Sequence, residues 1–333
     1  MNKSNENSNK HTGIPVTIIT GFLGSGKTTL LNHILSNQGG LKTAVLVNEF
    51  GEIGIDNELI IKTGEDMIEL TNGCICCSIN GELLDTINSI LDTNEGIEYL
   101  IIETTGLADP LPIAMTITSF RERLRLDSII TLIDAENFEN ETIHSQIGRS
   151  QIIYGDILLL NKSDLVTKDK LTHIESMLSE IKKNPRILIS KNGDVPLPLL
   201  LSVGLFQTDV IASKSIIHDH DHDHDHHHHH ERPTIEGFTS LSFTSNHPFA
   251  LRKFQYFLDN QMPSSIYRAK GIIWFNESEI THIFHLAGKR FTIDDSYSDR
   301  PRKNQIVFIG KNLDHESLQQ QLKACEIINS KNH

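Results

Sequence analysis

Residues 21–28 read GFLGSGKT, a glycine-rich run that ends in a lysine and a threonine. It follows a short apolar stretch and precedes one with helical spacing, which is the setting of a phosphate-binding loop. Glycines allow backbone N–H groups to face phosphate oxygens, the lysine reaches the β- and γ-phosphates, and the threonine hydroxyl binds Mg²⁺. The helix N-terminus adds partial positive charge. The predicted nucleotide-binding residues of this loop, with Mg²⁺ on Thr28, are Gly21, Gly24, Ser25, Gly26, Lys27, Thr28 and Thr29.

Residues 161–164 read NKSD and follow another apolar run. The Asp164 carboxylate can accept hydrogen bonds from N1–H and the exocyclic amine of guanine, a donor pair that adenine lacks. We therefore predict that Asn161, Lys162 and Asp164 bind the guanine of GTP, with Ser190 and Lys191 completing the pocket. The alternative is a solvated polar loop.

Residues 103–106 read ETTG, again after an apolar run. An acid at a strand end beside a phosphate loop can hold Mg²⁺ through water, and a glycine there can present its N–H to the γ-phosphate. We predict that Lys27, Glu103 and Gly106 form the catalytic set, and that residues 48–51 and Asp56 sense the nucleotide. No catalytic glutamine or arginine is evident, so we expect slow turnover. The alternative for Glu103 is a strand-end carboxylate with no ligand.

Residues 73–77 read GCICC and place three sulfur atoms within four positions. Thiolates at this density repel one another unless a cation neutralises them, and Zn²⁺ is a common thiolate-bound cation. Cys74, Cys76 and Cys77 leave one tetrahedral position for Glu49, a histidine, water or a ligand from a client. Cobalt is a second candidate metal, and buried inert thiols or redox chemistry are the alternatives. The remaining Cys325 is expected to be a small core residue.

A second candidate metal segment is the tract HDHDHDHDHHHHH at residues 218–230, which holds nine of the 18 histidines. Imidazoles bind several divalent transition metals, so we expect this tract to collect metal without much selectivity. A merely solvated linker is the alternative, because such a composition cannot build a core. The predicted ligands are His218, His220, His222, His224 and His226.

The composition is that of a globular protein, with 38% hydrophobic and 22% charged residues among 333. A net charge of −13 argues against a general nucleic-acid binder. No apolar run is long enough for a transmembrane helix, and residues 1–13 have no apolar core of a secretory signal. Four cysteines, three of them clustered, favour a cytoplasmic protein over a disulfide framework.

These candidate residues need elements to position them, and apolar runs alternate with amphipathic stretches from residue 14 to about 190. This alternation predicts a doubly wound parallel α/β sheet, with the functional loops at the carboxyl ends of the strands. The expected strands are 16–21, 43–47, 99–102, 127–133, 156–160 and 186–189. The expected helices are 28–35, 82–91 and 168–183.

A smaller α+β domain is expected after the histidine tract. Its predicted strands are 234–245, 272–275, 282–286 and 305–309, and its predicted helices are 248–258 and 315–327. The predicted organisation is a tail at 1–13, a nucleotide domain at 14–205, a linker at 206–233 and a C-terminal domain at 234–330.

The chain resembles the CobW-type GTPases, a family of metallocentre-assembly and metal-homeostasis proteins. The resemblance rests on GFLGSGKTT at 21–29, NEFGE at 48–52, GCICC at 73–77, ETTGLADP at 103–110 and NKSD at 161–164. It extends to the C-terminal domain through RAKG at 268–271 and QIVFIG at 305–310. It implies a P-loop GTPase domain, a CobW-type C-terminal domain, and cysteines whose metal is held or released according to the bound nucleotide. Internal histidine tracts are commonest in the zinc-associated branch of the family.

The resulting hypothesis is a metallochaperone that uses GTP and Mg²⁺ to deliver zinc to a client metalloenzyme. Delivery of cobalt or iron is the first alternative. A P-loop kinase and a protein that only buffers zinc through its histidines are the others. We expect no nucleic-acid or membrane partner, and either a monomer or a metal-dependent dimer.

Overall fold

The computed structural model describes residues 13–37, 41–47, 67–71, 81–94, 96–138, 143–202, 237–296 and 302–328. Its contacts divide the chain into two compact units, one containing residues up to Leu201 together with Ala287–Arg290, and one containing Ser202–Leu286 and Phe291–His333. Among the described helices, none is both long enough and apolar enough to cross a membrane.

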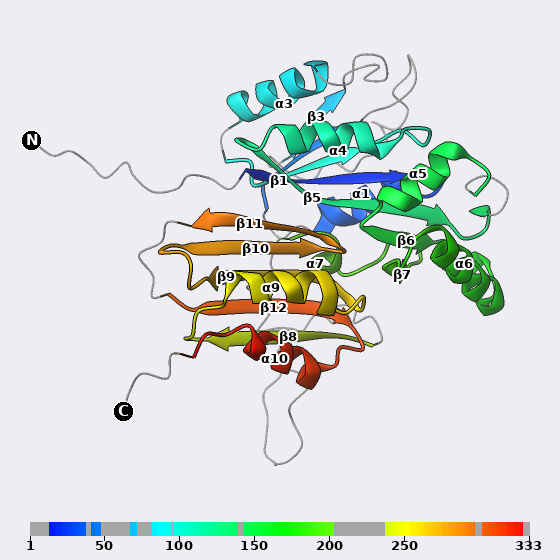
Figure 1. Ribbon diagram of the computed structural model, residues 1–333. Helices are drawn as coiled ribbons and strands as arrows, with labels where there is room; N and C mark the ends of the chain where they lie inside the picture. Colours follow the sequence, from blue (N-terminus) through cyan, green and yellow to red (C-terminus); the bar gives the residue numbers. More distant parts are fainter. Residues whose placement is uncertain are drawn as a thin grey trace, which may run out of the picture. The chain divides into compact units, whose positions relative to one another are not determined.

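The first unit contains a seven-stranded sheet in the order β3-β2-β4-β1-β5-β6-β7 (Figure 1). All of its pairings are parallel, which confirms the predicted doubly wound class. β1 lies between β4 and β5, so the loop that follows it is central at the carboxyl edge. The strands are β1 Ile14–Gly21, β2 Thr43–Val47, β3 Met67–Thr71, β4 Tyr99–Glu103, β5 Leu124–Asp134, β6 Ile157–Asn161 and β7 Ile187–Ile189.

Helices cover this sheet in two layers. α3 and α4 pack on the face that carries Ile18 and Ile129, and α5 and α6 pack on Ile133 and Leu160. The strand register places these side chains on the same face, while α1 lies on the other side (Figure 1). The helices are α1 Lys27–Asn37, α3 Gly81–Thr93, α4 Pro110–Ser119, α5 Gln146–Tyr154, α6 Lys168–Ile181 and α7 Leu197–Leu200, with a 3₁₀ turn η2 at Ser163–Leu165.

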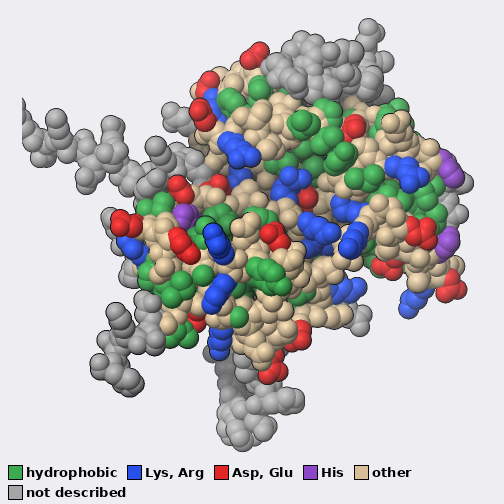
Figure 2. Space-filling model, viewed as in Figure 1, with side chains coloured by type: hydrophobic (Ala, Val, Ile, Leu, Met, Phe, Trp, Pro, Cys, Tyr) green, Lys and Arg blue, Asp and Glu red, His purple; other side chains and the backbone are tan. Residues whose placement is uncertain are grey.

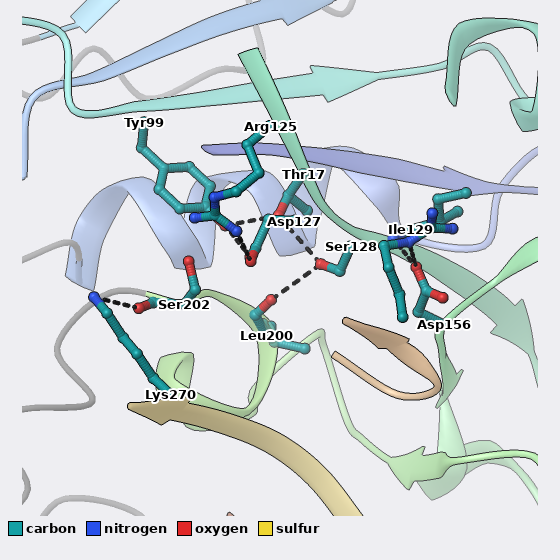
Figure 3. Close-up of polar contacts among 11 residues, drawn as sticks. Thr17, Tyr99, Arg125, Asp127, Ser128, Ile129, Asp156, Leu200, Ser202 and Lys270 are labelled. Carbon is teal, nitrogen blue, oxygen red and sulfur yellow. Dashed lines mark hydrogen bonds and ion pairs between the residues drawn. The ribbon is translucent and has the colours of Figure 1, made fainter. Parts of the chain in front are cut away.

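A buried polar network joins the central strands at their amino ends (Figure 3). The Tyr99 hydroxyl donates to Asp127 Oδ2 at 2.5 Å and lies 2.8 Å from Thr17 Oγ1, which is 3.2 Å from Ser128 Oγ. Arg125 contacts the other oxygen of Asp127 at 3.4 Å. Hydrogen bonds to a buried carboxylate offset its lost hydration. This network fixes β1, β4 and β5 at the edge opposite the phosphate loop.

The second unit contains a five-stranded sheet in the order β11-β10-β9-β12-β8, with antiparallel pairing of β12 to β8 and β9. α9 and α10 cover one face (Figure 1), where a core rich in phenylalanine includes Phe254, Phe257, Phe284 and Phe308. The strands are β8 Phe238–Ser245, β9 Ile266–Trp274, β10 Thr281–Ala287, β11 Arg290–Ser296 and β12 Asn304–Lys311. The helices are α9 Leu251–Tyr256 and α10 His315–Ala324, and a π-helical turn η4 spans Phe257–Gln261.

Several elements of this unit differ from the expected ones. The strand expected at 272–275 is the end of β9, whose first half carries Arg268 and Lys270 and therefore lacks an apolar run. β11 was not expected, because its sequence RFTIDDS is mostly polar. α10 ends at Ala324, three residues before the predicted end. Antiparallel strands with one apolar face give a weaker sequence signal than doubly covered parallel strands.

Candidate nucleotide site

The phosphate loop lies between the end of β1 at Gly21 and the start of α1 at Lys27. Gly21, Gly24 and Gly26 all have positive φ angles, of 141°, 72° and 99°. At Gly26 a Cβ would also lie 2.5 Å from the Asn161 amide nitrogen, so both the backbone angle and the space require glycine there. Thr29 is exposed in the first turn of α1, whereas Ser25 is buried.

Lys27 and Thr28 begin α1 and connect the loop to other parts of the site. The Lys27 ammonium donates to the Phe22 carbonyl at 3.2 Å, across the loop. The Thr28 hydroxyl donates to Glu103 Oε1 at 3.1 Å, although the two residues are 75 positions apart in the chain. A hydroxyl and a carboxylate are hard oxygen ligands of the kind that Mg²⁺ prefers. The structure therefore brings together the two predicted Mg²⁺ residues, Thr28 at the start of α1 and Glu103 at the end of β4.

Gly106 packs directly against the phosphate loop. A Cβ at this position would lie 2.6 Å from the Leu23 backbone nitrogen, so no larger residue fits without moving the loop. Leu23 and the neighbouring Leu107 are 55% and 47% exposed, which gives this edge an apolar rim. Figure 2 shows further apolar side chains on the surface over α4 and α5, where Met115 and Tyr154 are among the exposed residues.

Asn161 connects the phosphate loop to the predicted base loop. Its Nδ2 donates to the Ser25 carbonyl at 3.0 Å, and its Oδ1 accepts from Ser190 Oγ and from the Gly193 N–H, each at 3.0 Å. The side chain is buried, and each polar atom of its amide has a partner. Asn161 therefore holds three segments together: the phosphate loop, the end of β6 and the loop after β7.

Lys162 follows Asn161 in a left-handed conformation with φ 58° and forms an ion pair with Asp134 at 2.7 Å. Asp134 ends β5, where it also accepts from Asn137 and from backbone N–H groups. Burial raises the pKa of this carboxyl, but hydrogen bonds from Lys162 and Asn137 and from the Glu136 N–H outweigh it and hold the pKa below its ordinary value. Lys162 is thus fixed by a carboxylate that stays ionised at neutral pH.

The remaining predicted base residues lie at the same edge. The Ser163 N–H and hydroxyl both donate to the Ser190 carbonyl, at 3.2 and 2.8 Å, which joins the turn η2 to the end of β7. Lys191 Nζ lies 3.9 Å from Asp164 Oδ2, and the Asp164 side chain is 35% exposed. Asp164 is therefore accessible to a ligand, and its charged neighbour is a predicted pocket residue.

Two residues of this site carry no motif and were missed in the sequence. Asp134 is the last residue of an apolar strand, and only this place distinguishes it from other acidic residues. Gln151 lies on α5, which was not expected, and donates to the carbonyls of Gly106 and Ala108 at 3.2 and 3.0 Å. Both act on predicted site residues through contacts that no local pattern contains.

The predicted ligands of the transition metal and the nucleotide-sensing segments lie outside the described residues. These are Glu49, Cys74, Cys76, Cys77, His218, His220, His222, His224 and His226, together with residues 48–51 and Asp56. Within the described ranges, no group of three or more His, Cys, Asp or Glu side chains is placed to hold a metal ion. Cys325 is described and buried, as expected.

The likeness to known proteins agrees with this geometry. Residues 15–188 match the family model described as CobW/HypB/UreG, nucleotide-binding domain. The chain belongs to this family. Residues 238–326 match the Cobalamin synthesis protein cobW C-terminal domain, so CobW-type sequence extends over both units. The chain is therefore a P-loop GTPase of the CobW type.

Curated relatives of this CobW-type chain carry related names. It is 32% identical over 319 residues to the zinc chaperone YjiA of Escherichia coli (strain K12), covering 92% of this chain and 96% of that protein. It is 29% identical over 384 residues to zinc-regulated GTPase metalloprotein activator 1 of Dictyostelium discoideum, covering 94% and 79%. Among solved structures, Zn(II)-bound YjiA GTPase from E. coli is 27% identical, with a TM-score of 0.45 and coverage of 95% and 100%.

Proposed function

We propose that this chain is a GTP-dependent metallochaperone that carries zinc as cargo and releases it to a client metalloprotein when GTP is hydrolysed. Family membership supports the GTPase class, and the names of two relatives support zinc as cargo. The client would be a metalloenzyme that requires this metal. Cobalt is the alternative cargo, because cysteine sites bind several ions.

The observation that carries the proposal is the hydrogen bond between Thr28 and Glu103. It joins the start of α1 to the end of β4, just before Gly106. The γ-phosphate and Mg²⁺ would therefore be bound by the two loops that follow β1 and β4. Thr28 and Glu103 would hold Mg²⁺, which neutralises charge on the β- and γ-phosphates when bound. Lys27 would bind the same phosphates, and Asp164 would read guanine. With no assigned glutamine or arginine for hydrolysis, intrinsic turnover is slow.

The cargo site in this proposal is Cys74, Cys76 and Cys77, with Glu49, a histidine, water or a client ligand in the fourth position. His218, His220, His222, His224 and His226 would collect metal within a linker at 206–233. This linker would join a nucleotide domain at 14–205 to a C-terminal domain at 234–330. The protein would act in the cytoplasm, as a monomer or a metal-dependent dimer.

Coupling between nucleotide and cargo follows from the order of segments in the chain. The cysteines fall between residues 48–56 and 103–106, the two segments expected to respond to the γ-phosphate. Ordering those segments would form the thiolate site, and hydrolysis would loosen it. Thermodynamic linkage then requires the effect to be reciprocal: if GTP raises the affinity for zinc by some factor, zinc raises the affinity for GTP by the same factor.

A competitive zinc and cobalt titration tests this proposal. It uses the chain with residues 218–230 deleted, with GDP or a non-hydrolysable GTP analogue, and Cys76→Ala as the matched control. We expect at least tenfold tighter zinc binding with the analogue, and loss of that site in Cys76→Ala. Equal affinity in both nucleotide states refutes gating. Loss of all tight binding on deleting the tract alone would instead indicate a zinc buffer.

Turnover without an acceptor separates this function from a P-loop kinase. GTP should be converted to GDP by the purified chain alone, slowly and with ATP a poor substitute. A requirement for a small-molecule acceptor would contradict the proposal.

A further inference from the structure

Gln151 occupies an unusual position for a glutamine. It lies in the middle of α5 with 0% of its surface exposed, and its Nε2 donates to the Gly106 and Ala108 carbonyls at 3.2 and 3.0 Å. Both acceptors are carbonyls, so only the NH₂ end of the amide can face them. Its own backbone carbonyl accepts from the Thr131 hydroxyl at 2.7 Å, which ties this turn of α5 to β5.

The other end of the same amide lacks a partner. Among the described atoms, Gln151 Oε1 is buried without a hydrogen bond. Burying an unpaired acceptor is unfavourable, and an apolar side chain of similar length would avoid it. The NH₂ group therefore explains why a glutamine occupies this position, because it donates to two backbone carbonyls that α5 would otherwise bury without a partner.

The segment that Gln151 holds is closely packed on its opposite side. Gly106 lies against the phosphate loop, where a Cβ would approach the Leu23 nitrogen to 2.6 Å. Ahead of it, the Thr104 N–H donates to the Ile19 carbonyl at 2.9 Å, which fixes the start of the segment to β1. After it, Asp109 begins α4 by accepting from the Leu111 N–H at 2.9 Å. Gln151 thus anchors the middle of a segment whose two ends are already fixed.

We propose that Gln151 is a positioning residue that sets how strongly the Gly106 segment distinguishes GTP from GDP. The inference rests on the proposed GTPase function. With the Gly106 and Ala108 carbonyls held by α5, the peptide before Gly106 can rotate its N–H toward a γ-phosphate without displacing residues 106–108. Gln151 touches no nucleotide and acts through this backbone alone. Without it, ordering the segment on GTP carries a larger entropic penalty, whereas GDP makes no contact there.

Binding of GDP and of a non-hydrolysable GTP analogue to the full chain tests this role, together with single-turnover GTP hydrolysis. Gln151→Met preserves side-chain length but removes the donor. We expect its affinity for the analogue and its hydrolysis rate to fall about tenfold, with GDP affinity within twofold of the unmodified chain. Gln151→Asn, one methylene shorter, provides a second test if the methionine variant does not fold.

Thr131→Val is the matched control, because it removes the hydrogen bond to the Gln151 backbone and leaves the carboxamide in place. Its ratio of analogue to GDP affinity should stay within twofold of the unmodified chain. Equal losses for both nucleotides in Gln151→Met, or no loss, overturn the positioning role. If the unmodified chain hydrolyses GTP but Gln151→Met leaves the ratio of analogue to GDP affinity unchanged, only this inference fails. If it binds no guanine nucleotide, the proposed function fails as well.

Discussion

Replacing Asn161 by alanine removes three buried hydrogen bonds and leaves their partners in place. The Ser25 carbonyl, the Ser190 hydroxyl and the Gly193 N–H each lose a contact of 3.0 Å, at a site where Asn161 is only 2% exposed. A buried polar group without its partner is destabilising by about 1–3 kcal/mol. Because one side chain makes all three contacts, the effects are not additive, and we expect a loss of about 3–5 kcal/mol in the first unit.

Hydrogen exchange measured by mass spectrometry separates this effect from the second unit. Amides of β1 and β6 should exchange faster by a factor that corresponds to the lost free energy, while amides of β12 serve as an internal reference. Ser163→Ala is the matched control. It removes one hydroxyl contact to Ser190, but the Ser163 N–H still donates to the same carbonyl, so we expect a loss below about 1 kcal/mol.

Asn161→Asp tests which of the three contacts matters most. The aspartate can still accept from Ser190 and Gly193, but it places a carboxylate oxygen against the Ser25 carbonyl. We expect this variant to bind GDP more weakly than the unmodified chain even where β6 remains protected from exchange. If Asn161→Ala destabilises the unit no more than Ser163→Ala does, the reasoning that Asn161 holds three segments together is wrong.

Asp134→Asn should weaken GDP binding several-fold. Because the pKa of the Asp134 carboxyl is lowered in the folded chain, the substitution should destabilise the chain fully above pH about 4, and this loss should vanish as the pH falls through the folded-state pKa. Acid unfolding of both chains checks this. Burial raises the pKa of Cys325 to about 11, so stability relative to Cys325→Ala should fall between pH about 9 and 11, as melting temperatures would reveal. Tyr99→Phe should lower the free energy of unfolding, measured in urea, by about 1–3 kcal/mol. It should leave GDP affinity unchanged, because the contact of Tyr99 with Asp127 lies at the strand ends opposite the phosphate loop.

The parts of the site that could be predicted from the sequence are those whose chemistry is local. The glycines of the phosphate loop are required by backbone angles that few other residues adopt, so their spacing alone identifies the loop. The first five strands of the expected parallel sheet carry apolar runs because helices cover both faces. That pattern predicted the fold class and placed Thr28 and Glu103 at the same edge.

Residues that act through long-range contacts could not be predicted in this way. Gln151 lies in the helix QIGRSQIIY, where Gly148 and the polar residues weaken the helical pattern, and its acceptors are 43 and 45 residues away. Asp134 needs Lys162, whose left-handed backbone no local rule predicts. Charged residues in the first half of β9 similarly interrupt its apolar pattern, so only the end of that strand was predicted. In each case the deciding interaction is tertiary.

The central position of β1 has a consequence for how the chain is made. β1 is synthesised before both strands that flank it in the sheet, and the later of them follows after a long interval: Thr17 and Ser128, which share a hydrogen bond, are 111 residues apart. At about 5–20 residues per second, synthesis of that interval lasts roughly 5–20 s. Until β4 is made, the apolar side chains of Val16, Ile18 and Ile19 have no neighbouring strand on either side, and the side that faces β5 stays without a partner for the whole interval. The nascent chain should therefore depend on general chaperones during this interval, and synonymous codons that speed synthesis between β1 and β5 should reduce its aggregation.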